Sequence, residues 1–106
     1  MSIERLKKYR RNQADEQIET MERNRDVYRK VHDLFVARQI PGCESINLSQ
    51  KTRCITIRFI GMAVQWYYHT DMCHVHNGNA GIKKYELKPP LLLARLMQGR
   101  SAFING

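Results

Sequence analysis

The spacing of apolar residues changes along the chain, and each change marks an expected element. Residues 1–40 contain no glycine or proline and are rich in Arg, Lys, Glu and Gln, which favour helix. From residue 27 the apolar positions follow one helical face, at Val27, Val31, Leu34 and Phe35. We therefore predict an N-terminal helical segment, either one kinked helix or two helices meeting near residues 24–26. Its second half should pack on a sheet, and Pro41-Gly42 should end it.

A strict alternation of apolar and polar residues follows over residues 53–59. Ile55, Ile57 and Phe59 should point to one face of a strand, and the residues between them to the other. Asn77-Gly78 is typical of a two-residue type I′ hairpin turn. Weaker strand patterns occupy residues 45–48, 63–70, 72–76 and 82–87. Together they predict a three- to five-stranded antiparallel meander.

The two faces of the strand at residues 63–70 both carry aromatic residues, so either could face the core. Val64, Trp66 and Tyr68 share one face, while Gln65, Tyr67 and His69 share the other. If Val64 and Trp66 are buried, the outer face of the sheet becomes polar, aromatic and partly basic, with Thr56 and Arg58 beside it. The strand at residues 82–87 divides similarly, with Ile82, Lys84 and Glu86 on one face and Lys83, Tyr85 and Leu87 on the other.

A short apolar helix is expected near the C-terminus, after Lys88-Pro89-Pro90. Its apolar face should close the core, with Arg95 outside and Gly99 as the C-terminal cap. The apolar residues concerned are Leu92, Leu93, Leu96 and Met97. Residues 99–106 are expected to be a tail, with Phe103 and Ile104 either tucked in or left for a partner. The predicted fold class is α+β, a single domain over residues 1–106, with residues 1–24 as a candidate projecting extension.

Composition adds a strong basic bias to this scaffold. The 106 residues carry a net charge of +8, and the isoelectric point is about 9.8, so the surface should attract polyanions, nucleic acid first among them. Three cysteines without a CxxC motif argue against a disulfide framework and favour a reducing compartment. We find no signal-peptide pattern and no apolar run long enough to span a bilayer, and we expect a cytoplasmic protein with no membrane partner and no cofactor.

Basic residues gather at two places, and both are candidate phosphate contacts for a non-catalytic nucleic-acid-binding protein. One is an N-terminal arm made of Arg5, Lys7, Lys8, Arg10 and Arg11. The other is a basic and aromatic sheet patch made of Arg53, Arg58, Tyr67, Lys83, Lys84 and Tyr85. The sequence leaves open whether the nucleic acid is DNA or RNA, single- or double-stranded.

A run of potential metal ligands lies at residues 69–76, but strand alternation argues against a metal site. His74 and His76 should lie on one face and Cys73 on the other, so the run cannot converge on one ion. The same histidines, His69, His74 and His76, would be the acid–base groups of a metal-independent endoribonuclease, with nearby cations on the phosphate. This is the enzymatic alternative.

A third alternative is a small regulator or inhibitor that docks on a larger protein, such as a nucleic-acid enzyme with an acidic surface. The N-terminal helical segment is charged and has few apolar residues over residues 3–21, which suits such a contact as well as it suits an arm on DNA. Met21, Tyr28 and Phe35 recur every seven residues, so a homodimer through this segment is also considered.

Overall fold

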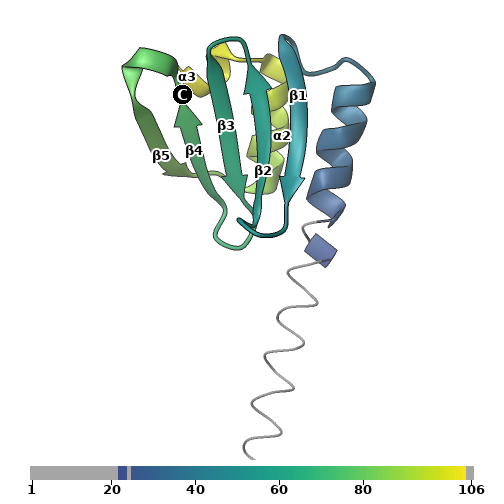
Figure 1. Cartoon of the computed structure of the whole chain (residues 1–106). Helices are drawn as coiled ribbons and strands as arrows, with labels where there is room; N and C mark the ends of the chain where they lie inside the picture. Colours follow the sequence, from purple (N-terminus) through teal and green to yellow (C-terminus); the bar gives the residue numbers. More distant parts are fainter. Residues whose placement is uncertain (1–21, 24, 105–106) are drawn as a thin grey trace, which may run out of the picture.

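Five strands form one antiparallel sheet, and in the part of the chain that the structure describes the helices lie on one side of it (Figure 1). The computed structural model describes residues 22–23 and 25–104. The chain is helical at residues 22–23 and 25–36. The elements that follow are β1 (Cys43–Ser49), β2 (Cys54–Phe59), β3 (Met62–Tyr67), β4 (Met72–His76), a 3₁₀ turn η1 (Gly78–Ala80), β5 (Ile82–Glu86), α2 (Pro89–Gln98) and α3 (Ser101–Ile104).

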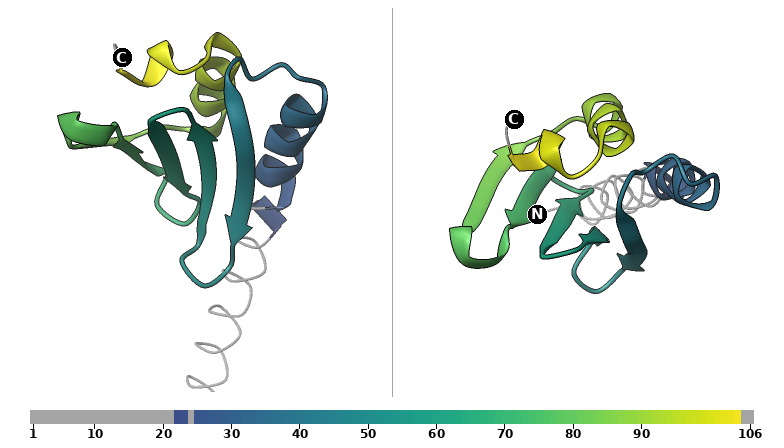
Figure 2. Two further views of the ribbon diagram at one scale, coloured as in Figure 1. Left: turned by 45° about the horizontal axis from the view of Figure 1, so that its top comes forward. Right: turned by 90° about the horizontal axis from the view of Figure 1, so that it is seen from above.

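The strands follow one another across the sheet in the order β1-β2-β3-β4-β5, and each pair is antiparallel. Figure 2 shows the helix of residues 25–36 and α2 lying against the same side of the sheet. The predicted α+β class, the antiparallel meander and the closing C-terminal helix are confirmed. The predicted extension over residues 1–24 lies almost entirely outside the described residues.

The first helix packs on the sheet through the face that its sequence predicts. Val27 and Val31 are buried, and Leu34 and Phe35 are half-buried against the same core. The helix ends at residue 36 through two C-terminal hydrogen bonds, from the Arg38 amide to the Phe35 carbonyl and from the Gln39 amide to the Leu34 carbonyl. Both bonds belong to the Schellman motif, which stops the helix before Pro41 is reached.

Arg38 occupies the left-handed position of this motif, with φ of 57°. Glycine is the usual residue there, because a Cβ atom costs about 1–2 kcal/mol in that conformation. The first helix therefore ends at a strained residue, and this end is a place where the local sequence and the fold disagree.

The core lies between the sheet and the helices, with Trp66 at its centre. Trp66 is fully buried on β3, and its indole Nε1–H donates a 2.7 Å hydrogen bond to the Leu87 carbonyl. A buried indole needs such a partner, because an unpaired N–H in an apolar core would be costly. Leu92 and Leu96 of α2 and Phe103 of α3 are also fully buried and complete the cluster.

Four local expectations are wrong. Asn77-Gly78 does not form a type I′ turn, because β4 and β5 are joined by a longer loop in which the Asn77 amide donates to the Gly81 carbonyl. Residues after Gly99 are not simply a tail, since Ser101–Ile104 form α3, although Phe103 is buried as one of the two expected alternatives has it. Met97 is half exposed and so leaves the apolar face of α2. Arg95 is half-buried rather than outside.

Arg95 is held inside by an aromatic neighbour. Its guanidinium carbon lies 5.2 Å from the centre of the Tyr85 ring, which is cation–π distance. Burial, and then the nearby Cys73, raises the pKa of Tyr85 to about 12. The Tyr85 hydroxyl and Arg95 Nη1 are buried and have no hydrogen-bond partner within the described residues.

Candidate nucleic-acid interface

The side of the sheet that faces away from the helices is called the open face here. Strand register arranges its side chains in three rows that run from β1 to β5. The first row is Ser45, Arg58, Ala63, His76 and Ile82; the second is Asn47, Thr56, Gln65, His74 and Lys84; the third is Ser49, Cys54, Tyr67, Met72 and Glu86. Adjacent members of a row lie about 5 Å apart, and rows are about 7 Å apart. Most of these side chains are polar, aromatic or basic.

Tyr67 and His74 form an aromatic pair in the middle of the open face. Their ring centres are 4.7 Å apart, and the rings are tilted by 53°. They lie on the adjacent strands β3 and β4, one row apart, and both are half-buried. The exposed His69 ring stands edge-on to Tyr67, with 6.3 Å between the centres, just after β3. Tyr67 therefore has two histidine rings as aromatic neighbours.

Hydrogen bonding orients a second histidine on the same face. His76 Nε2 lies 2.8 Å from Gln65 Oε1, so the imidazole N–H donates to the amide oxygen. This bond leaves the amide nitrogen of Gln65 as a donor. His74 lies between Gln65 and Lys84 in its row. Its pKa is lowered by desolvation, and then by Lys84 and His76, so its ring is neutral at pH 7.

Two exposed basic side chains lie on the open face. Arg58 and Lys84 are both exposed, and Lys84 lies directly opposite His74. The only carboxylate in the three rows is Glu86, whose Oε1 lies 3.1 Å from Lys88 Nζ. Its charge is thus partly balanced by a lysine outside the rows. The face therefore favours anions.

Two β2 positions on the open face are less accessible than the sequence suggests. Cys54 and Thr56 lie on this face, yet only 2% and 8% of them are exposed. They stand opposite the larger Tyr67 and Gln65 on β3, and the Cys54 Sγ lies 3.2 Å from the Thr52 hydroxyl.

The predicted sheet patch is divided by the fold. Arg58, Tyr67 and Lys84 lie together on the open face, whereas Lys83 and Tyr85 lie on the opposite, helix-covered side. Lys83 Nζ donates to the Ile104 carbonyl over 2.8 Å, and Tyr85 packs under Arg95. These two residues cannot share one surface with the other three. Arg53 is exposed in the turn before β2, with φ of 55°.

The predicted N-terminal arm cannot be placed. Its members, Arg5, Lys7, Lys8, Arg10 and Arg11, all lie outside the described residues. Their contact with nucleic acid stays a prediction.

The run at residues 69–76 is dispersed as the alternation predicts. His74 and His76 lie on the open face, while Cys73 is fully buried on the other side. Burial raises the pKa of the Cys73 thiol to about 11, so it remains protonated at pH 7 and is a poor metal ligand. Within the described residues no group of three or more potential ligands could hold a metal ion.

Asp71, in the turn between β3 and β4, is a structural anchor. Its carboxylate is buried and accepts from Arg23, at the start of the first helix, over 2.5 Å and from Lys88 over 3.3 Å. Its backbone carbonyl also accepts from the Leu87 amide. Asp71 therefore ties the first helix and the segment after β5 to the β3–β4 turn.

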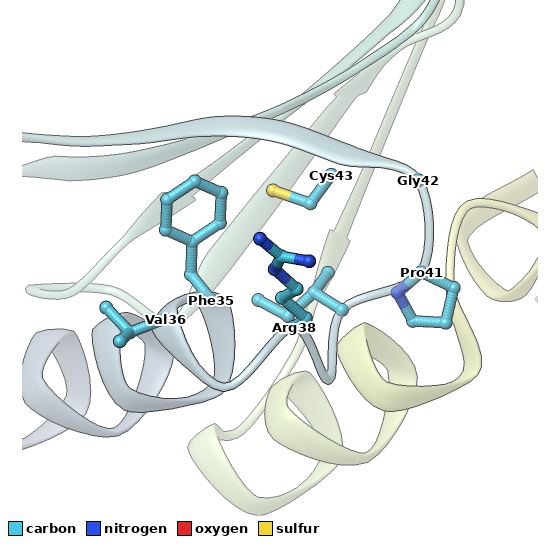
Figure 3. Close-up of a pocket in the computed structure, with 7 residues that line it drawn as sticks. Phe35, Val36, Arg38, Pro41, Gly42 and Cys43 are labelled. Carbon is cyan, nitrogen blue, oxygen red and sulfur yellow. The ribbon is translucent and has the colours of Figure 1, made fainter.

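A separate groove of mixed polar and apolar lining lies where the first helix meets β1 (Figure 3). It encloses about 510 Å³ and is lined by Phe35, Val36, Arg38, Ile40, Pro41, Gly42 and Cys43. Figure 3 shows the Arg38 side chain extending toward the Cys43 thiol. Burial raises the pKa of this thiol. The groove is on the other side of β1 from the aromatic pair and shares no residue with it.

Sequence reasoning missed three features of the molecule. The pairing of Tyr67 with His74 needs the β3–β4 register, although the period-two pattern in both strands hints that they share a face. The anchoring role of Asp71 depends on Arg23, forty-eight residues away. The groove around Arg38 has no local signal, because the left-handed position that ends the helix is occupied by Arg38 and not by the usual glycine or asparagine.

Comparisons with known proteins add no functional assignment: no protein-family model, no curated protein and no solved structure matches this chain. In the described part of the chain, no helix is long and apolar enough to cross a membrane.

Proposed function

We propose that this protein binds nucleic acid without catalysis, through the open face of its sheet. The observation that carries the proposal is the Tyr67–His74 aromatic pair, with 4.7 Å between the rings, and Lys84 directly opposite His74. Aromatic rings beside cations on an exposed sheet allow bases to stack while phosphates are neutralised. The net charge of +8 supports attraction of such a polyanion.

Each group on the face has a distinct role in this proposal. Arg58 and Lys84 contact phosphates, because both are exposed cations. Gln65 offers its amide nitrogen to a base acceptor, since its oxygen is occupied by His76. The N-terminal arm of five basic residues adds further phosphate contacts. Lys83 and Tyr85 take no part, because they lie on the helix-covered side.

A matched pair of lysines tests the proposal. Lys84→Gln and Lys83→Gln remove the same charge at adjacent positions, but from opposite faces of β5. We expect only Lys84→Gln to weaken binding, measured as fluorescence anisotropy of labelled DNA and RNA at low salt. It should also lower the slope of log K against log salt by about 0.7–0.9, the value of one lost phosphate contact.

Equal effects of the two substitutions would show that the interface does not lie on the open face. If no DNA or RNA, single- or double-stranded, binds at low salt, the proposal is wrong.

Metal-independent RNA cleavage is a second candidate, because His74 and His76 share the open face with Lys84. A general base and a general acid two residues apart on a strand stand about 7 Å apart, one on each side of a bound phosphate. His69 lies in the turn, further from this pair. The expected activity persists in EDTA and disappears in His74→Ala. Intact RNA after prolonged incubation with the wild-type protein would eliminate this candidate.

The remaining expectations are kept as predictions. Docking on an acidic protein surface and dimerisation through the N-terminal helical segment depend on residues that are mostly outside the described part. A cytoplasmic location is consistent with three unpaired cysteines, Cys43, Cys54 and Cys73.

A further inference from the structure

We infer that the open face selects single-stranded nucleic acid over duplex, with an unpaired base stacked on Tyr67 and His74. This inference rests on the proposed function and names its substrate class. It follows from three features of the face: the form of its aromatic surface, the number of its cations and the position of its hydrogen-bonding groups.

The aromatic surface is of use only to an unpaired base. Tyr67 and His74 are half-buried and tilted by 53° to one another, so each ring leaves part of its surface accessible. In a duplex, the flat faces of the bases are already stacked on their neighbours and cannot reach a protein ring. A single strand can turn its bases outward and place them on such a platform.

The number of cations on the face is too small for tight binding of a duplex. Only Arg58 and Lys84 are permanent cations among the fifteen positions of the three rows, and Glu86 opposes them. Duplex binding without base contacts depends on phosphate neutralisation, typically about six to ten contacts. Affinity at this face must therefore come mainly from stacking, which changes affinity by about 5- to 150-fold per base.

The polar groups are placed to contact a base that is stacked on the pair. Gln65 stands directly opposite His74. It lies two residues before Tyr67 on β3, in the neighbouring row. Its amide nitrogen is free to donate, because its oxygen accepts from His76. Lys84 lies on the other side of His74. A base on the aromatic pair would thus have a hydrogen-bond donor on one side and a phosphate-binding cation on the other.

His74 supplies the second ring of this platform. Desolvation, Lys84 and His76 lower its pKa, so at pH 7 the ring is a neutral imidazole beside Tyr67. At neutral pH the positive charge next to the two rings therefore comes from Lys84.

The test compares labelled 20-nucleotide single strands, of DNA and of RNA, with the matching duplexes in fluorescence anisotropy at fixed salt. The full chain is used, as wild type, Tyr67→Leu and Tyr67→Phe. We expect single strands of at least one type to bind tenfold or more tightly than the duplex. Tyr67→Leu should lower single-strand affinity by about 5- to 150-fold, and Tyr67→Phe should keep it, because the ring is retained.

Salt dependence separates the face from the N-terminal arm. Contacts from Arg58 and Lys84 alone predict a slope of about −1.4 in log K against log salt, at about −0.7 per contact on a single strand. Engagement of all five arm residues as well would steepen it to about −4.9. Either slope is compatible with stacking on Tyr67, so the inference is decided by the strand preference and by the Tyr67 variants.

The outcomes distinguish this inference from the proposed function. Equal binding of duplex and single strand, sensitive to Lys84→Gln but not to Tyr67→Leu, would overturn the single-strand inference and leave nucleic-acid binding intact. Absence of any binding would overturn both. Buried Trp66 reports folding of each variant by its fluorescence, and a Tyr67→Phe protein that folds normally but loses binding would also contradict a stacking role.

Discussion

The two faces of the sheet are made by the same strands, yet they have opposite chemistry. On the helix-covered side, Ile55, Ile57, Val64 and Trp66 are all fully buried. On the open side, alternate positions of the same strands carry threonine, glutamine, tyrosine and histidine. One face forms the core, and the other, apart from the buried Cys54 and Thr56, carries side chains that are partly or fully accessible. The comparison shows why candidate function should be sought on the face whose side chains remain accessible.

Trp66 and Tyr67 give the largest expected contrast, because they are adjacent aromatic residues on opposite faces. Trp66→Ala should lower the free energy of unfolding by about 3–5 kcal/mol, since it leaves a cavity and removes the bond to Leu87. Tyr67→Ala should lower it by about 1 kcal/mol, because its ring is only half-buried. Urea denaturation followed by far-UV circular dichroism measures both. Equal losses would show that the open face also stabilises the fold.

Asp71 tests whether the covered face depends on an ionic anchor at its edge. Asp71→Asn should lower the free energy of unfolding by about 1–2 kcal/mol, because the partners Arg23 and Lys88 lose a buried carboxylate but are themselves largely exposed. Asparagine tolerates the left-handed backbone at this position, φ 58°, as well as aspartate does. Because asparagine has nearly the same size as aspartate, the change in the thermal unfolding midpoint of this variant measures the effect of removing the charge. An unchanged midpoint would mean that the anchor contributes nothing to stability.

Arg38 is expected to show the reverse effect at the end of the helix that covers the sheet. Arg38→Gly should raise the free energy of unfolding by about 0.5–1 kcal/mol, because relief of the left-handed strain outweighs the greater freedom of glycine in the unfolded chain. Arg29→Gly, an exposed position in the interior of the same helix, is the contrasting control and should be destabilising by a similar amount. A fall in stability for Arg38→Gly would indicate that contacts of the arginine side chain in the groove outweigh the strain.

The smallest expected effect is the pH dependence of the open face. The pKa of His74 lies below its usual value of 6.5 in the folded protein, so protonation on acidification favours the unfolded chain, and stability falls as pH drops below about 6.5. Bound phosphate favours the charged imidazole, so affinity for nucleic acid should rise as pH falls from 7 to 5.5, by no more than about fivefold. The groups that face His74 are Tyr67, Gln65, His76 and Lys84.

His74→Gln is the control for this dependence, because it keeps a polar side chain and removes the titrating group. Its binding curves at the two pH values should move closer together than those of the wild type. A pH response that is unchanged in this variant would assign the effect to another group.

Much of the fold can be predicted from local pattern. The alternation at residues 53–59 and 72–76 identifies two strands almost to the residue, because apolar side chains two positions apart have only one way to reach a common core. The helical spacing of Val27 and Val31 likewise identifies the packing face of the first helix. The β4–β5 turn is harder to predict, since the hydrogen bonds of Asn77 with the Gly81 carbonyl and the Arg100 side chain involve residues outside the Asn77-Gly78 dipeptide.

The sequence by itself determined the α+β architecture, the basic charge, and the separation of Cys73 from His74 and His76 onto opposite faces. All three depend on composition or on a period of two or 3.6 residues, which short stretches contain in full. Only the tertiary structure decided that Tyr67 meets His74, that Lys83 and Tyr85 leave the open face, and that Asp71 binds Arg23. These facts require strand register and helix placement, which are set by the packing of residues far apart in the chain and so leave no local signature.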